Sequence, residues 1–181
     1  MKRWLILVFC CILVQLANAV PYEVTDLGRS GGGIAYSVNN AGQVVGTIGL
    51  WEDGNITPIG PVGSICYAIN NLGQVTGIAT GGAAFIWDKD NDLRTIPLPT
   101  GNIGYAIGYG INDSGMVAGL SGDGPCIWDD VNGTRTFGGS GAAYDINNLN
   151  QAVGYYFSSR ATSFIWDETN GIRYLNPSTG D

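Results

Sequence analysis

Hydrophobic and polar residues alternate over short runs along most of the chain, and clusters of Gly, Asn and Asp separate these runs. Alternation over a few residues is typical of half-buried β-strands, and the intervening clusters are typical of turns. Beyond the N-terminus no stretch keeps the period of about 3.6 residues that an amphipathic helix requires. The pattern therefore predicts an all-β fold.

One alternating segment, YAINNLGQVTG at Tyr67 to Gly77, recurs in four copies. The related segments are YSVNNAGQVVG, YGINDSGMVAG and YDINNLNQAVG, which begin at Tyr36, Tyr109 and Tyr144. A Trp follows each copy, and these tryptophans are 36, 41 and 38 residues apart. Four short strands per unit of about 40 residues is the blade period of a β-propeller.

We therefore expect residues 20–181 to form a β-propeller-like array of about four four-stranded repeats. The approximate units are 29–60, 61–99, 100–138 and 139–176. Each unit supplies a Tyr, an Asn, a turn residue, a closing Gly and a Trp. These structural positions are Tyr36, Asn39, Gly42, Gly46 and Trp51; Tyr67, Asn70, Gly73, Gly77 and Trp87; Tyr109, Asn112, Gly115, Gly119 and Trp128; and Tyr144, Asn147, Asn150, Gly154 and Trp166.

The segment N-x-x-G predicts a hairpin whose turn ends on a residue in the left-handed region. In the fourth copy Asn150 replaces the Gly, and Asn is the next residue after Gly to tolerate that conformation. The preceding Asn is expected to bond the turn's own backbone. The alternative is that four Asn amides on one rim hold a ligand.

The closing glycines and the tryptophans suggest packing. A Gly in a strand interior marks a bend or a close approach of two backbones. One Trp per repeat, always preceded by Leu or Ile, indicates a core between stacked sheets. The alternative for the tryptophans is a platform on which a sugar stacks.

The N-terminus predicts a signal peptide over residues 1–19. Lys2 and Arg3 precede an apolar run from Trp4 to Leu13, and the sequence ANA follows at Ala17 to Ala19. No later segment is long and apolar enough to span a membrane as a helix. We expect a secreted protein, extracellular or periplasmic, that is cleaved near Ala19.

The charge of the mature chain excludes two classes of partner. The full chain has a formal net charge of −7, and cleavage would remove Lys2 and Arg3 but no acidic residue, which leaves −9. Nucleic acid and anionic lipid both require clustered Lys and Arg. The expected partner is therefore an extracellular protein or a glycan.

Two of the four cysteines, Cys66 and Cys126, would remain after cleavage. In an oxidising compartment they could form a disulfide. Their repeat positions favour two buried thiols, because Cys66 aligns with small residues and Cys126 aligns with Phe85 and Phe164.

The residues with catalytic potential form no recognisable site. There is no histidine, which excludes imidazole chemistry and His-bound zinc or copper. The acidic residues fall mostly at predicted hairpin tips. Of these, Asp88, Asp90 and Asp92 have the alternate spacing of a calcium loop but lack its Gly and distal Glu. We assign no catalytic residue and no cofactor.

The unit A-Y-x-V-N-N-x-G-Q-V-V-G, followed by A-F-I-W, resembles the HAF repeat family of extracellular bacterial proteins. The match is clearest at 35–46, 67–77 and 84–87, and YEVTDLG at Tyr22 to Gly28 resembles the segment that leads into the first such repeat. The resemblance implies secretion and a repeated β fold. The His-Ala-Phe triplet of the family appears here as AAF, GPC and TSF, so no role of that His is carried over.

These observations predict a secreted, non-enzymatic scaffold for structure or binding at the cell surface or outside the cell. The rival is a carbohydrate-binding or carbohydrate-active propeller, which requires tip carboxylates beside exposed Trp. Residues 22–27 look like a spare strand, which predicts a short or truncated array. Its ends would expose strand edges and favour self-association through them.

Overall fold

The computed structural model describes residues 27, 33–99, 104–122, 124–157 and 160–175. The predicted signal peptide, residues 1–19, and most of the predicted spare strand lie outside these residues. The described residues form 16 strands in four four-stranded antiparallel sheets. The predicted all-β fold of four four-stranded repeats is therefore confirmed.

Each sheet consists of four strands that follow one another in the chain, so each repeat is a meander. Repeat 1 contains β1 (Ala35–Val38), β2 (Val44–Gly46), β3 (Gly49–Glu52) and β4 (Asn55–Thr57). Repeat 2 contains β5 (Ile65–Ile69), β6 (Val75–Ala79), β7 (Ala83–Asp88) and β8 (Asp92–Thr95). Repeat 3 contains β9 (Ile107–Ile111), β10 (Val117–Ser121), β11 (Gly124–Asp129) and β12 (Gly133–Thr136). Repeat 4 contains β13 (Ser140–Ile146), β14 (Ala152–Phe157), β15 (Ala161–Asp167) and β16 (Gly171–Tyr174).

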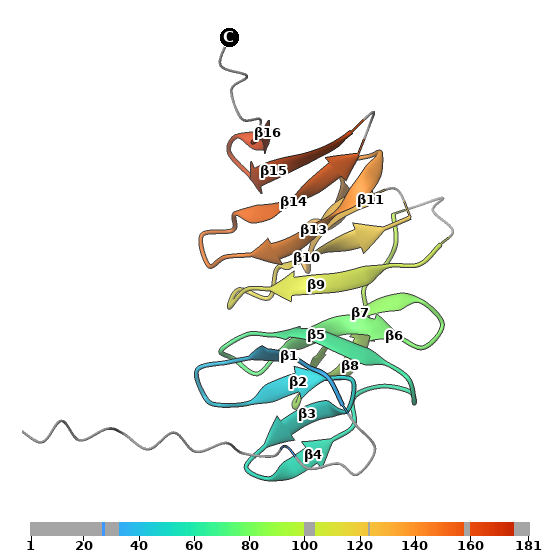
Figure 1. Ribbon diagram of the computed structural model, residues 1–181, viewed down its shortest axis with the longest axis vertical. Coiled ribbons are helices and arrows are strands. Elements are labelled where there is room, and N and C mark those ends of the chain that lie inside the picture. The colour runs from blue at the N-terminus through green and yellow to red at the C-terminus, as the bar shows by residue number, and fades with distance from the viewer. Residues whose placement is uncertain (1–26, 28–32, 100–103, 123, 158–159, 176–181) are drawn as a thin grey trace, which may run out of the picture.

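The four sheets are stacked in chain order (Figure 1). The first strand of each later repeat packs on the second and third strands of the repeat before it: β5 on β2 and β3, β9 on β6 and β7, β13 on β10 and β11. Repeats 1 and 4 lie at opposite ends of the stack, so the array is an open arc (Figure 1). The described residues therefore do not form a closed four-bladed ring.

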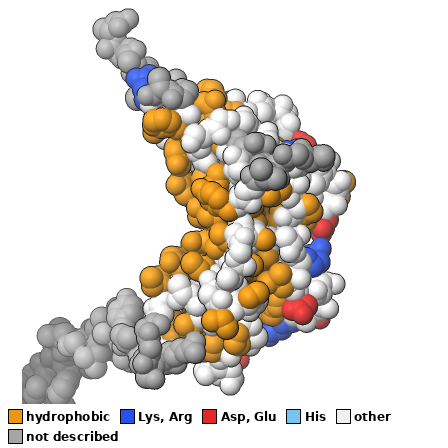
Figure 2. All heavy atoms as spheres, turned by 90° about the vertical axis from the view of Figure 1, so that its right-hand side faces the viewer, with side chains coloured by type: hydrophobic (Ala, Val, Ile, Leu, Met, Phe, Trp, Pro, Cys, Tyr) orange, Lys and Arg blue, Asp and Glu red, His pale blue; other side chains and the backbone are white. Residues whose placement is uncertain are grey.

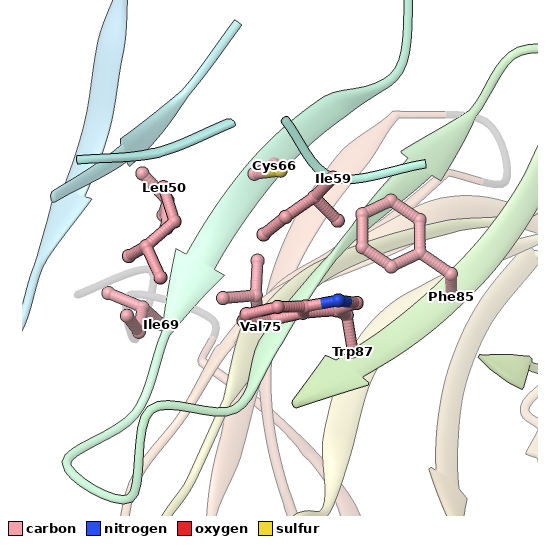
Figure 3. Close-up of a cluster of buried hydrophobic side chains, with 8 residues drawn as sticks. Leu50, Ile59, Cys66, Ile69, Val75, Phe85 and Trp87 are labelled. Carbon is pink, nitrogen blue, oxygen red and sulfur yellow. The ribbon is translucent and has the colours of Figure 1, made fainter. Parts of the chain in front are cut away.

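Each internal repeat has two buried faces, because a blade is covered on both sides. We call the face toward the preceding repeat the leading face and the face toward the following repeat the trailing face. Val45 and Leu50 on the trailing face of repeat 1 pack against Ile69, Val75 and Trp87 on the leading face of repeat 2 (Figure 3). Equivalent clusters join repeats 2 and 3 and repeats 3 and 4.

The arc has a concave and a convex side with different surfaces (Figure 2). Hydrophobic side chains line the concave side, and most of the charged side chains lie on the convex side in this view. First strands of consecutive repeats contact one another, β1 with β5, β5 with β9 and β9 with β13. The blades therefore converge at their first strands, as in a propeller.

Candidate functional site

The recurrent N-x-x-G segment forms the first hairpin of every repeat, and together these four hairpins make one rim. The turn residues Gly42, Gly73 and Gly115 have φ of 78°, 77° and 79°, and Asn150 has φ of 59°. The left-handed conformation expected at this position is therefore confirmed in all four repeats. A side chain other than Asn or Asp is strained there.

The first Asn of each hairpin organises its own turn. In repeat 2, Asn70 Oδ1 accepts hydrogen bonds from the backbone N–H groups of Leu72 at 3.1 Å and Gln74 at 2.9 Å. Asn39, Asn112 and Asn147 accept the same pair of bonds in the other repeats. The predicted local role of this Asn is confirmed.

The same Asn residues also join one repeat to the next, which the sequence did not suggest. Asn39 Nδ2 donates to the Asn70 carbonyl at 3.0 Å, and Asn70 Nδ2 donates to the Asn112 carbonyl at 2.8 Å. Asn112 Nδ2 continues the series to the Asn147 carbonyl at 3.0 Å. We call this series the Asn ladder. Each amide thus satisfies buried main-chain groups in two repeats at once.

The residue after each ladder Asn forms a second series beside the first. The backbone N–H of Asn40 donates to Asn71 Oδ1 at 3.1 Å, and that of Asn71 donates to Asp113 Oδ1 at 2.9 Å. Asp113 N–H then donates to Asn148 Oδ1 at 2.8 Å. Hydrogen bonds from the side chain and backbone of Asn71 lower the pKa of Asp113, so this carboxyl is ionised at neutral pH.

These two series occupy the floor of a groove of about 360 Å³ that runs along the rim and is lined by residues of all four repeats. Most of the amides that could face a ligand there already bond the neighbouring hairpin. The groove is therefore built as a seam between repeats. This arrangement disfavours the alternative in which the four Asn amides hold a ligand.

The recurrent Tyr is the extra residue of a β-bulge. In repeat 2, Cys66 pairs with Gly77 and Ala68 pairs with Thr76, so Tyr67 has no partner across the hairpin. Tyr36, Tyr109 and Tyr144 are skipped in the same way. The bulge directs these rings to one side, where successive ring centroids lie 5.1, 5.3 and 5.2 Å apart. The tyrosines therefore form a stack that continues through all four repeats.

The closing Gly stands opposite this bulge. A Cβ atom on Gly77 would lie closer than 3.0 Å to the carbonyl oxygen of Ile65, and Gly46, Gly119 and Gly154 are confined by the equivalent carbonyls. The close backbone approach expected at these positions is confirmed. The bulge requires a Gly opposite it, because the displaced backbone of the bulged strand occupies the space that a side chain at the Gly position would need.

The tryptophans lie in the interfaces between sheets. Trp87, Trp128 and Trp166 are buried on leading faces, and Trp51 of the first repeat is half-buried. Stacking of a sugar requires an open ring face. The three buried indoles do not offer one.

The hairpin between the third and fourth strands of repeats 2–4 carries the acidic residues. Asp88 Oδ1 accepts hydrogen bonds from the Asp90 and Asn91 backbones and from the Asn91 side chain. Asp129 and Asp167 repeat this arrangement with Asn132 and Asn170.

The calcium candidate Asp88, Asp90 and Asp92 lies at the hairpin tip that the sequence predicts, between β7 and β8. Within the described residues no group of three acidic, His or Cys side chains converges to hold a metal ion. Asp92 is the left-handed residue of the turn, with φ of 57°, and Asp88 caps the turn backbone. The alternate spacing belongs to a hairpin tip.

Arg side chains from the fourth strand neutralise these tip carboxylates. Arg135 Nη1 lies 2.8 Å from Asp129 Oδ2, and Arg173 Nη2 lies 2.7 Å from Asp167 Oδ2. Partial burial opposes ionisation of Asp129, but bonds from Asn132 and Val131 and the charge of Arg135 outweigh it. The pKa of Asp129 is therefore lowered. Such a carboxylate is a poor general acid at neutral pH.

A polar hollow on the described surface lies between the first hairpins of repeats 1 and 2 and the tip of repeat 2. It has a volume of about 560 Å³, and its lining includes Gln43, Asn71, Leu72, Gln74, Lys89 and Asp90. Leu72 is an exposed apolar side chain on the rim. No pattern in the sequence indicates this hollow, because its walls come from three segments that lie about 15 to 45 residues apart.

Both described cysteines are free and buried. Cys66 packs in the interface between repeats 1 and 2, whereas Cys126 belongs to repeat 3. Burial raises the pKa of each thiol to about 12, and a bond with Ser121 opposes this rise at Cys126. The predicted pair of buried thiols is confirmed.

We expect Cys66 and Cys126 to resist modification in the native protein. With a pKa of about 12, roughly one thiol in 10⁴ is ionised at pH 8, and neither sulfur is open to solvent. In the chain carrying Cys10→Ser and Cys11→Ser, Ellman's reagent should find no thiol at pH 8 and two after unfolding in guanidinium. Rapid native labelling, or a disulfide between the two in intact-mass analysis, would contradict this assignment.

The described residues contain no helix that is long and apolar enough to cross a membrane. Comparison of the chain with protein families, with curated proteins and with solved structures finds no match in any of the three.

Proposed function

We propose that this protein is a secreted, non-enzymatic repeat scaffold of β-propeller type, which acts at the cell surface or outside the cell. The observation that carries the proposal is the use of the recurrent side chains. The ladder Asn residues, the stacked Tyr residues and the buried Trp residues all join one repeat to the next. The side chains that recur in every repeat therefore serve to hold the array together.

The proposal of secretion is supported by the N-terminal sequence and by the resemblance to HAF repeats. Export is tested by expressing the full chain in a bacterium and separating the cytoplasm from the exported fraction. The exported protein should begin at Val20 by intact-mass analysis, and Leu7→Arg should retain it in the cytoplasm. Uncleaved protein that stays in the cytoplasm would refute export.

The binding role of the scaffold is assigned to the 560 Å³ hollow and its exposed Leu72, because this surface is polar and concave and presents an apolar side chain to solvent. A screen against immobilised glycans and extracellular proteins tests it. Binding should weaken in Lys89→Ala and Leu72→Asp and persist in Val131→Asp, which changes an exposed side chain on another hairpin. Binding that ignores both hollow substitutions would move the site elsewhere.

The rival, a carbohydrate-active propeller, is tested with the same protein. Asp90 lies in the hollow and carries no ion pair among the described residues, which makes it the carboxylate to examine. Glycosidic-bond hydrolysis that is lost in Asp90→Asn and retained in Asp53→Asn would contradict the scaffold proposal and identify the protein as an enzyme. We expect no turnover in any of these proteins.

A further inference from the structure

The leading face of repeat 1 is apolar and uncovered. At the last position of the first strand, Val38 is 64% exposed. Its equivalents in the later repeats are almost fully covered: Ile69 is 6%, Ile111 7% and Ile146 5% exposed. Ala35 is likewise exposed where Cys66 and Ala143 are buried. The face keeps the composition of an interface although no repeat precedes it in the described structure.

The trailing face of repeat 4 has the opposite half of the same interface. Val153 is 42% exposed, whereas its equivalents Val45, Thr76 and Ala118 are at most 1% exposed. Ile165, the partner of Val153 on β15, is half-buried, and Phe157, which lies on β14 with Val153, is exposed. Terminal repeats of stacked arrays need a polar outer face to stay apart in solution. Both terminal faces here are apolar.

The Asn ladder ends with unused groups that match. Within the described residues, Asn147 Nδ2 donates only to Gln151, although each preceding ladder Asn also donates to the next repeat. At the other end, the Asn39 carbonyl receives no bond from a preceding repeat in the described structure. Donors are therefore left at the end of repeat 4, and acceptors at the start of repeat 1.

Repeats 1 and 2 are joined by the pair Lys89 and Glu52, whereas the two later interfaces have an Arg–carboxylate pair that leaves complementary charges at the ends of the arc. Arg94 of repeat 2 contacts Asp130 of repeat 3 at 3.2 Å, and Arg135 of repeat 3 lies 3.6 Å from Glu168 of repeat 4. The next Arg in this series is Arg173, on β16, and the equivalent acidic position in repeat 1 is Asp53. The positive charge of Arg173 therefore lies at the repeat 4 end of the arc, and the negative charge of Asp53 lies at the repeat 1 end.

We propose that the trailing face of repeat 4 docks on the leading face of repeat 1 of a second copy of this chain. The junction repeats the packing and the Asn bond of the three internal interfaces: Val153 covers Val38, and Asn147 Nδ2 donates to the Asn39 carbonyl. Arg173 pairs with Asp53, as Arg94 and Arg135 pair with the following repeat at two of these interfaces. It is heterologous, because each copy contributes a different face. Two copies that form two such junctions close a ring of eight repeats, within the range of four to eight blades that propellers have.

This junction differs from pairing through strand edges. The surfaces that lack a partner at the ends of the arc are the faces of whole sheets, so the proposed contact is a stacking of sheets, whereas the sequence predicts association through strand edges. The three interfaces inside the chain supply the geometry and the donor–acceptor pattern, and the two later ones supply the charge pattern. A second copy of the chain is the partner that presents all three in the right order.

The first test is the mass of the purified protein, with its N-terminus determined by mass spectrometry. Light scattering after size exclusion should give a multiple of the chain mass at about 50 µM, a dimer if the ring closes. Val38→Asp and Val153→Asp should each give a monomer. The matched control Val131→Asp, at a 90% exposed hairpin position, should keep the mass of the unchanged protein.

The second test distinguishes a head-to-tail junction from other contacts. The Val38→Asp chain keeps an intact trailing face, and the Val153→Asp chain keeps an intact leading face. A 1:1 mixture should therefore form a heterodimer although each variant alone is monomeric. An interface made of the same face on both copies could not be restored by mixing, so mixtures that remain monomeric overturn the proposal.

Folding is checked independently. Both changed side chains are partly exposed, and far-ultraviolet circular dichroism and the thermal midpoint of each monomer should stay close to those of the Val131→Asp chain. A compact monomer from the unchanged protein overturns the proposal. In that case protection of residues 34–38 from hydrogen exchange would identify a segment of the same chain as the cover.

Discussion

Gly77→Ala is expected to lower the free energy of unfolding by at least about 3 kcal/mol. The added methyl group would lie closer than 3.0 Å to the Ile65 carbonyl oxygen and carbon and 3.0 Å from Cys66 Cα, and backbone cannot rotate away as a side chain can. The bulge at Tyr67 brings this carbonyl over the Gly. Relief of the clash would require the bulge to open, which would disturb the Tyr stack and the interface with repeat 1.

The measurement is urea unfolding followed by tryptophan fluorescence. Gly104→Ala is the matched control, because its Cβ would meet only Gly122 at 3.6 Å, an ordinary van der Waals contact. This control should be within about 0.5 kcal/mol of the unchanged protein. Equal effects of the two substitutions would show that the close approach at the bulge does not govern stability.

Asn70→Ala is expected to cost about 2–4 kcal/mol. The substitution removes two bonds that shape the turn and leaves the Asn112 carbonyl without its donor from repeat 2. Asn70 is only 4% exposed, so water does not readily replace the lost bonds. The expected loss therefore exceeds that of an ordinary turn residue.

Asn147→Ala separates the two roles of the ladder Asn. Asn147 makes the same bonds within its hairpin, but in the single chain no following repeat receives its amide. Measured in the Val153→Asp chain, where the proposed junction is absent, Asn147→Ala should cost about 1 kcal/mol. A loss as large as that of Asn70→Ala would show that the bond between repeats adds nothing.

Local features of the fold could be predicted because their physical causes lie within a few residues. The left-handed turn residue could be predicted because three repeats have Gly at this position and the fourth has Asn150. Gly and Asn share a tolerance of the left-handed conformation, so the position is set by a backbone requirement. The buried thiols follow from positions where other repeats place Ala or Phe. The buried tryptophans follow from their regular register.

The links between repeats could not be predicted, because one partner in each is a main-chain group. A carbonyl is present at every residue, so nothing in the sequence marks the Asn112 carbonyl as the acceptor of Asn70, 42 residues earlier. The bulge that releases Tyr67 is likewise a shift of register between two strands. Such a shift is decided by the packing of whole sheets.

The spacing of charges at the tip of repeat 2 matches a calcium loop but does not by itself specify one. Asp88, Asp90 and Asp92 alternate like calcium ligands, but a two-residue period carries that meaning only in a loop that turns its oxygens inward. Here the chain reverses direction within the same residues, and Asp88 bonds the turn. The Asp88 carboxylate is therefore occupied by hydrogen bonds from its own hairpin.

The sequence by itself determined the four repeats, the strand content and the conformation of the first hairpins, since alternation and turn chemistry act over a few residues. Only the tertiary structure decided that the array is an open arc, that Asn and Tyr residues run through it as continuous series, and that both ends expose apolar sheet faces. Curvature and closure depend on the small rotation between stacked repeats, which is the sum of many packing contacts. The curvature of the array therefore cannot be predicted from any single residue type.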